Sequence, residues 1–168
     1  MTAVEPQKSR VAFMDETGAP AVHCPEAPAR MAEYCRPDSE CVMLLTLLRA
    51  KIHGAIITQA NRNYVGSITI DRDLLKLSGL LPNERVLVAD IHNGVRFETY
   101  ILAGEKGTGV IGINGAAAHL VKPGEKIIIM AFAEMSPEEA AEHEARVLVL
   151  DSSNKPIKNM TIASRLDV

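Results

Sequence analysis

The sequence has few aromatic residues and no excess of basic charge. Its 168 residues include no tryptophan, three tyrosines and three phenylalanines, and the formal net charge is −3. A protein that binds nucleic acid usually presents a basic surface to the phosphates and aromatic rings to the bases. This composition supplies little of either, so we expect no nucleic-acid partner.

Long hydrophobic runs are also absent. The longest largely apolar stretches, residues 42–48 and 127–133, have the length of β-strands. A membrane-spanning helix needs roughly 18 apolar residues. Charged residues interrupt the N-terminal region, which therefore lacks the basic and apolar parts of a signal peptide. We expect a cytoplasmic protein with no membrane partner.

Cysteine is absent from the larger part of the chain. All three cysteines lie in residues 1–42, so the remainder contains no thiol nucleophile. The three cysteines and one nearby histidine lack the Cys-x-x-Cys spacing of a zinc site, and we predict no metal. These residues are Cys24, Cys35, Cys41 and His23.

Residues 1–42 differ from the rest of the chain in composition as well. They hold five of the nine prolines and seven acidic residues against four basic ones, and they show no regular apolar period. We predict a poorly structured N-terminal extension. Met43 opens the first patterned segment, so an alternative start at that residue would omit the extension altogether.

Residues 43–150 alternate short apolar runs with turn signals, which is typical of many short strands. The first two strands are expected at residues 44–48 and 55–58. The strongest local prediction is a hairpin of residues 86–91 and 95–102, because the Asn-Gly pair between them favours a tight turn. The sequence therefore predicts a small, mainly β barrel, with a C-terminal tail over residues 151–168.

Three short helices are expected beside these strands, one of them at residues 116–120. Asp71 can cap a helix that stops at Gly79, and Ser136 can cap one that begins with proline and two glutamates. The glycines of residues 107–112 match Gly-x-Gly-x-x-Gly, but that fingerprint must open a helix, and residues 110–113 have the pattern of a strand. We therefore expect no dinucleotide site.

The segment most informative about chemistry is Tyr64-Val65-Gly66-Ser67, followed by Ile70-Asp71. A Gly-Ser pair alone most often forms a turn before a strand. Here the whole stretch resembles the self-processing site of the pyruvoyl-dependent aspartate 1-decarboxylases. Three further segments fit that family in order and spacing, namely residues 49–53, 93–100 and 113–118. The resemblance covers residues 43–150 and implies a six-stranded double-psi β-barrel that assembles as a homotetramer.

The resemblance also implies that the chain cuts itself between Gly66 and Ser67. The Ser67 hydroxyl would attack the Gly66 carbonyl, and elimination of the resulting ester would turn Ser67 into a covalent pyruvoyl cofactor. This group forms a Schiff base with L-aspartate, which loses CO2 to give β-alanine for pantothenate and coenzyme A synthesis. Gly66 lacks a Cβ and can adopt the strained backbone that this attack requires. Thr99 would bind the developing oxyanion.

The remaining roles follow from the same resemblance. Tyr100 would donate the proton that replaces the lost carboxylate. Arg96 would bind a substrate carboxylate through its planar fork, with Lys51 as a second positive partner. The wall of the substrate site would be formed by Asn114, Gly115, Ala116 and Ala117.

Strand alternation leaves one question open. On a regular strand Arg96 and Tyr100 share a face, whereas Thr99 points to the other. Either a bulge changes this alternation, or Thr99 reaches Ser67 from its own side or from a neighbouring subunit. The plainer alternative is that Arg96 and Lys51 are solvated charges and Tyr100 is a half-buried barrel residue.

Two other classes of function are compatible with the same segment. An N-terminal nucleophile hydrolase would be cut at the same bond but would keep Ser67 as a free terminal nucleophile. A non-catalytic barrel that acts as a binding module would stay whole. The mass of the intact protein separates them, because only pyruvoyl formation leaves the larger fragment lighter by one ammonia.

Overall fold

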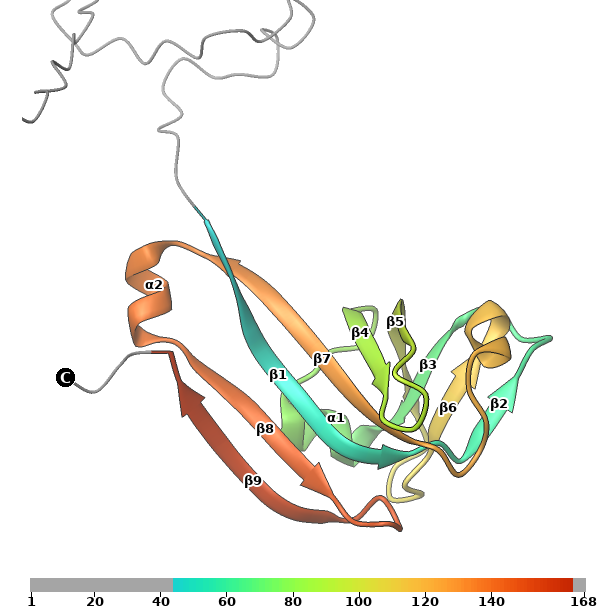
Figure 1. Ribbon diagram of the computed structural model, residues 1–168. Helices are drawn as coiled ribbons and strands as arrows, with labels where there is room; N and C mark the ends of the chain where they lie inside the picture. Colours follow the sequence, from blue (N-terminus) through green and yellow to red (C-terminus); the bar gives the residue numbers. More distant parts are fainter. Residues whose placement is uncertain (1–43, 165–168) are drawn as a thin grey trace, which may run out of the picture. The chain divides into compact units, whose positions relative to one another are not determined.

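Apolar residues at alternate positions build nine strands within residues 44–164, the part of the chain that the computed structural model describes (Figure 1). The predicted mainly β fold class with short helices is confirmed. The strands form one sheet in the order β2-β6-β3-β5-β4-β7-β1-β8-β9. Their bounds are β1 Leu45–Ile56, β2 Gln59–Asn61, β3 Ser67–Asp71, β4 Arg85–Asp90, β5 Arg96–Gly104, β6 Ile111–Asn114, β7 Lys126–Met135, β8 Glu144–Leu150 and β9 Pro156–Ala163.

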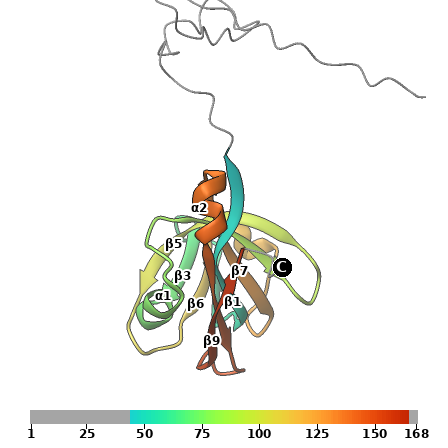
Figure 2. The ribbon, with the colours of Figure 1, turned by 90° about the vertical axis from the view of Figure 1, so that its left-hand side faces the viewer.

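The local predictions with the clearest sequence signals are confirmed. Strands β4 and β5 form the expected antiparallel hairpin around Asn93-Gly94. Helix α1 (Arg72–Ser78) is capped by Asp71 and ends at Gly79, whose φ of 75° is left-handed. Helix α2 (Pro137–Glu142) begins with a capping box between Ser136 and Glu139. A short 3-10 helix, η1 (Gly115–His119), follows β6. Figure 2 shows α1 and α2 at different ends of the domain. Within residues 44–164 no helix is long and apolar enough to cross a membrane.

Two strand predictions were wrong. The strands expected at residues 44–48 and 55–58 are not separate, because one continuous strand, β1, runs from Leu45 to Ile56 and contains most of the first and the start of the second. Its pairing with β7 shifts register at two irregular positions. Residues 156–163, expected to belong to a tail, form strand β9 and pair with β8. Almost every side chain of β9 is exposed, so its sequence carries no apolar alternation. Its backbone hydrogen bonds with β8 hold it in the sheet instead.

The core lies on the inner face of the curved sheet, and isoleucine is its most frequent residue. Among the fully buried side chains are Ile52, Ile68, Ile101 and Ile129, each on a different strand. Burial of one such side chain stabilises a fold by about 1.5–3 kcal/mol. The core therefore fixes the register of the strands, because a slip by one residue would expose a whole row of these side chains.

Asp71 ties the end of β3 to the glycine-rich turn that precedes β6. Its carboxylate is 2% exposed and accepts backbone N–H groups from Asp73 at 2.7 Å, Gly107 at 3.2 Å and Gly109 at 2.7 Å. Burial alone raises the pKa of Asp71, but these hydrogen bonds outweigh burial and leave the pKa below its usual value. The glycines of the Gly-x-Gly-x-x-Gly pattern thus serve this carboxylate and lead into a strand, as expected.

We predict that the Asp71→Asn substitution destabilises the domain in a pH-dependent way. Because folding lowers the pKa of Asp71, its stabilisation is complete above the unfolded-state value of 3.8 and is lost as the pH falls further. The loss of free energy of unfolding should be on the order of 1–3 kcal/mol at neutral pH and should shrink below about pH 4. Urea denaturation at several pH values measures it.

Asp73→Asn is the matched control, since the Asp73 carboxylate is part-exposed and lies 3.7 Å from the ammonium of Lys106. Such an exposed ion pair contributes little to stability. If the two variants lost the same stability at every pH, the Asp71 carboxylate would not be what holds the turn.

Candidate active site

Ser67 is the first residue of β3 and is buried, with 1% of its surface exposed. It lies directly opposite Asn114 in the antiparallel pairing of β3 with β6. The Asn114 side-chain amide donates to Ser67 Oγ at 3.0 Å and to Thr69 Oγ1 at 3.0 Å. A buried hydroxyl held by such a donor has a fixed position, which is a requirement for a nucleophile.

This contact was missed by sequence analysis, which expected Asn114 only as part of the substrate wall. The two residues are 47 positions apart, and nothing in either local pattern indicates that they are cross-strand partners. Thr69 was not considered as a site residue either. The only signal was that both Ser67 and Asn114 belong to segments that fit one family.

Gly66 precedes β3, and its φ in the uncut chain is not left-handed, unlike that of several other described glycines. A Cβ placed on Gly66 would meet its nearest neighbour, the Asn114 carbonyl oxygen, at an ordinary 3.9 Å. The uncut chain therefore has room for a side chain at this position.

Tyr100 adjoins Ser67 on the sheet. Strands β3 and β5 run parallel, with Ile68 opposite Ile101, and both isoleucines are fully buried in the core. The residues just before them, Ser67 and Tyr100, therefore lie side by side on the other face. Tyr100 is 40% exposed and lines a cavity of about 340 Å³ together with Arg85, Glu98 and Thr99. A phenol in this place can reach a molecule bound next to residue 67.

The alternation along β5 is regular. Residues from Arg96 to Tyr100 pair one by one with β4, so no bulge intervenes. Thr99 lies opposite Val86, a core residue, and therefore faces away from the side that carries Arg96 and Tyr100. The bulge considered from the sequence is excluded, and Thr99 must act from its own side of the strand or from another subunit.

Arg96 and Lys51 share the outer face with Tyr100 but lie far from Ser67. Arg96 is four residues from Tyr100, about 13 Å along the strand. Its guanidinium donates to the Gly94 carbonyl at 2.7 Å. Lys51 belongs to β1, which lies four strand spacings from β3, or about 19 Å along the sheet. The backbone positions of both cations are thus separated from Ser67 along the sheet.

His53 lies on the same face of β1 as Lys51, two residues further along. The Nδ1 atom of its ring is buried and makes no hydrogen bond with the described residues. Burial lowers the pKa of His53, and the nearby charges of Lys51 and Lys126 lower it further. The imidazole is therefore neutral near neutral pH, and the positive charge of this region belongs to the lysines.

The expected substrate wall follows directly on β6. Asn114 ends the strand, Gly115 turns the chain with a left-handed φ of 67°, and η1 continues through Ala116 and Ala117. Ala116 is exposed and Ala117 is half-buried. The wall thus begins at the hydrogen-bond partner of Ser67 and continues onto the surface.

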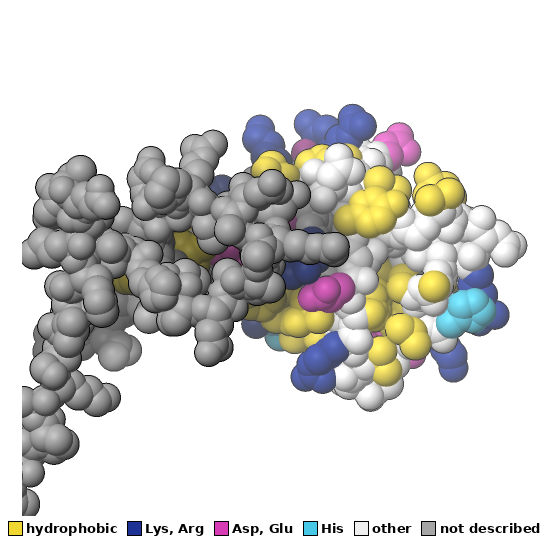
Figure 3. All heavy atoms as spheres, turned by 90° about the horizontal axis from the view of Figure 1, so that it is seen from above, with side chains coloured by type: hydrophobic (Ala, Val, Ile, Leu, Met, Phe, Trp, Pro, Cys, Tyr) yellow, Lys and Arg dark blue, Asp and Glu magenta, His cyan; other side chains and the backbone are white. Residues whose placement is uncertain are grey.

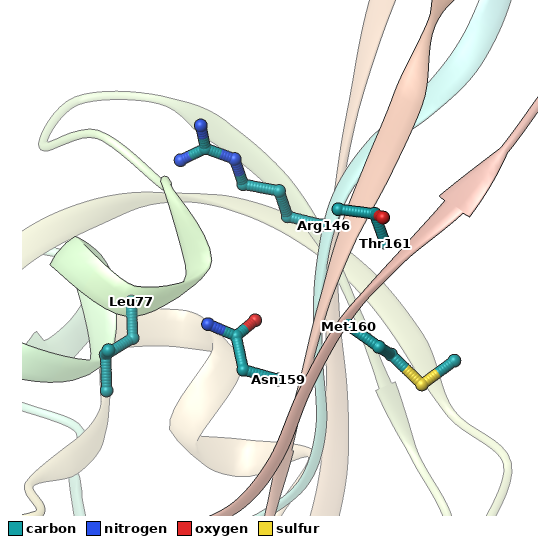
Figure 4. Close-up of a pocket in the computed structure, with 5 residues that line it drawn as sticks. All are labelled: Leu77, Arg146, Asn159, Met160 and Thr161. Carbon is teal, nitrogen blue, oxygen red and sulfur yellow. The ribbon is translucent and has the colours of Figure 1, made fainter.

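A cavity of about 430 Å³ lies elsewhere, between α1 and strands β8 and β9 (Figure 4). It is lined by Leu77, Arg146, Asn159, Met160 and Thr161, none of which belongs to the predicted site. The Arg146 side chain reaches Gly79 at the end of α1, where it would meet a Cβ at 2.8 Å. A cation over a helix C-terminus stabilises the helix, so we assign this arginine a structural role.

The described residues contain no group of three His, Cys, Asp or Glu side chains that could hold a metal. Cys24, Cys35, Cys41 and His23 lie outside the described residues. The groups that the described structure brings together are the buried Ser67 hydroxyl, the Asn114 amide and the Tyr100 phenol.

Comparison with known proteins identifies the family. The family model for aspartate decarboxylase matches residues 43–157. An aspartate 1-decarboxylase from Caldicellulosiruptor bescii is 52% identical over 116 residues, which are 69% of this chain and 91% of the relative. The matched segment contains every residue of the site described above. The chain therefore belongs to the aspartate decarboxylase family.

Proposed function

We propose that this chain is a self-processing lyase that converts L-aspartate to β-alanine and CO2 for pantothenate synthesis. Its membership of the aspartate decarboxylase family carries the proposal. The position of Ser67 supports it, because a buried serine that accepts from Asn114 and adjoins Tyr100 suits a residue that first reacts with its own chain and then with substrate. We also infer a cytoplasmic location, as the composition predicts.

The first step is cleavage between Gly66 and Ser67. A bond forms from Ser67 Oγ to the Gly66 carbonyl carbon, the peptide C–N bond breaks, and the hydroxyl proton ends on the nitrogen. Loss of the Ser67 α-proton and of the ester oxygen then frees the Gly66 carboxylate. Water finally replaces the nitrogen of residue 67, which leaves as ammonia, and a pyruvoyl group remains.

The residues around position 67 fit such a group. When present, it supplies a ketone that condenses with the substrate amine and accepts electrons as CO2 leaves. The Asn114 amide, which donates to Ser67 Oγ in the uncut chain, can donate to an oxygen at residue 67 after cleavage. Tyr100 would deliver a proton to the substrate carbon, and Thr99 would bind the oxyanion during cleavage from its own side of the strand or from another subunit.

L-Aspartate carries two carboxylates, so its site needs cations. Arg96 and Lys51 are the candidates, yet both lie about 13 Å or more from the Tyr100 and Ser67 positions along one sheet. We infer that a second copy of the chain supplies them, within a homotetramer of processed chains with four α and four β fragments. Figure 3 shows exposed hydrophobic side chains among lysines and arginines on the face of the domain seen from above, as would suit an interface between copies. Exposed apolar residues of the domain include Leu81, Ile91 and Phe132.

We predict that Ser67→Ala leaves the chain whole and inactive. The wild-type protein should yield fragments 1–66 and 67–168, the second lighter by one ammonia and blocked to Edman degradation. Intact-mass spectrometry and a β-alanine assay measure both effects. Decarboxylation by the Ser67→Ala variant would remove the pyruvoyl mechanism, and two fragments with a terminal serine would favour the hydrolase alternative.

We predict that Tyr100→Phe and Thr99→Val fail at different stages. Tyr100→Phe removes a proton donor, so cleavage should proceed while kcat per processed chain falls by about 10²- to 10⁴-fold. Thr99→Val removes an oxyanion donor and should slow cleavage on the order of 10²-fold. A paired time course of cleavage and β-alanine formation tests this. Blocked cleavage in Tyr100→Phe, with normal turnover of whatever chain is cut, would mean that the roles are reversed.

We predict that the inactive variants Ser67→Ala and Arg96→Ala restore activity when they are mixed, because each copy of the chain would supply the residue that the other lacks. Ser67→Ala lacks the cofactor and Arg96→Ala lacks the carboxylate partner. Random mixing of the two chains should regenerate about one quarter of the wild-type sites. The measurement is decarboxylase activity after co-expression with two distinct tags.

Ser67→Ala mixed with Tyr100→Phe is the matched control. Tyr100 adjoins Ser67 within one chain, so this pair should stay inactive. If the Tyr100 pair recovered and the Arg96 pair did not, the assignment of Arg96 to the second copy would be wrong.

A further inference from the structure

Gly115 packs its backbone against the segment that ends at the proposed cleavage site. A Cβ built on Gly115 would lie 2.7 Å from Gly66 Cα, 3.0 Å from Gly66 N and 3.2 Å from the Tyr64 carbonyl oxygen. All three neighbours are backbone atoms, which cannot rotate aside as a side chain can. Any side chain at position 115 must therefore displace the chain that leads into the Gly66–Ser67 bond.

The position that sterically requires glycine is therefore Gly115, opposite the cleavage site, and not Gly66 within it. A Cβ on Gly66 would meet nothing closer than 3.9 Å, whereas a Cβ on Gly115 would overlap Gly66 itself. Gly115 is buried and also has a left-handed φ of 67°, which independently favours glycine. Two separate constraints therefore act on one residue.

The contact lies at the point where the sheet stops holding the chain. The pairing of β3 with β6 begins at Ser67 and Asn114, so Gly66 and Gly115 are the next residues beyond its end. The side chains of Tyr64 and Val65 are 51% and 79% exposed and pack little against the domain. The close approach to Gly115 therefore does much to set the position of the Gly66 backbone.

We propose that Gly115 is a positioning residue for self-cleavage, in addition to the substrate-wall role that the family resemblance implies for it. Its bare Cα lets the Gly66 backbone lie close enough to β6 for Ser67 Oγ to reach the Gly66 carbonyl carbon. In the first step of self-cleavage, a bond forms between Ser67 Oγ and the Gly66 carbonyl carbon. The peptide C–N bond breaks, and the hydroxyl proton moves to the nitrogen. The inference rests on the proposed self-cleavage.

The experiment must separate the contact with Gly66 from the cost of a left-handed backbone. Gly124 provides the control, because its φ is 88° and a Cβ there would meet nothing within 4 Å. Gly115→Ala and Gly124→Ala therefore share the backbone strain, and only the first carries the overlap. Gly115→Asn and Gly124→Asn form a second pair, since asparagine tolerates the left-handed region better than alanine.

Cleavage of each full-length variant is followed by intact mass, and its folding by circular dichroism and thermal unfolding. Hydroxylamine is added to a second sample, because it cuts the ester that the first step forms but leaves the peptide bond. We expect folded Gly115 variants that are cut on the order of 10²-fold more slowly than their Gly124 counterparts, as for a reacting group displaced by about 1 Å. Hydroxylamine should release no fragment that ends at Gly66 from them, and fragments from Asn-Gly bonds such as Asn93-Gly94, which hydroxylamine also cuts, are told apart by mass.

Equal cleavage rates in the Gly115 and Gly124 variants would overturn the proposal while leaving the proposed function intact. Ester that accumulates in the Gly115 variants would also overturn it, since the attack would then proceed and only elimination would fail. If both Gly115 variants failed to fold while both Gly124 variants folded, Gly115 would be a packing residue of the whole domain and the proposal would be wrong. A wild-type chain that stays whole would remove the proposed function and this inference together.

Discussion

The antiparallel pairing of β3 with β6 is the interaction on which the candidate site depends. It buries Ser67, places the Asn114 amide on its hydroxyl and ends where the chain is proposed to be cut. Backbone hydrogen bonds of a sheet are directional and repeat at a fixed spacing, so they position the two strands more precisely than side-chain packing alone. Ser67, at the first position of β3, is held by this pairing. The residues before it, Tyr64 and Val65, have largely exposed side chains.

Polar contacts hold β3 at both ends. At its start, the Asn114 amide donates hydrogen bonds to Ser67 and Thr69. At its end, the Asp71 carboxylate accepts hydrogen bonds from backbone N–H groups of the glycine-rich turn. Each of these buried polar groups has a partner, which offsets the cost of removing it from water. Because the strand itself is fixed, the backbone change that cleavage requires falls on the segment before Ser67.

The two faces of the sheet carry different kinds of residue. The inner face of β5 contributes Ile101 to the core, and the outer face carries Arg96 and Tyr100. Lys51 lies four strands away from β3, and Arg96 lies about 13 Å along β5 from Tyr100, so neither backbone position adjoins Ser67. This separation supports the proposal of a site shared between copies, whose interface would also cover exposed apolar residues.

The sequence by itself determined the features that depend on near neighbours. Asn93-Gly94 set the hairpin, Asp71 and Gly79 bounded α1, and the Tyr64–Ser67 segment indicated the family, because turn chemistry, capping and a short motif are local. The tertiary structure decided what depends on distant partners. It made β9 a strand through pairing with β8, and it set Asn114 against Ser67 and Gly115 against Gly66. Those contacts join residues that are far apart in the chain, and only the register of the folded sheet brings them together.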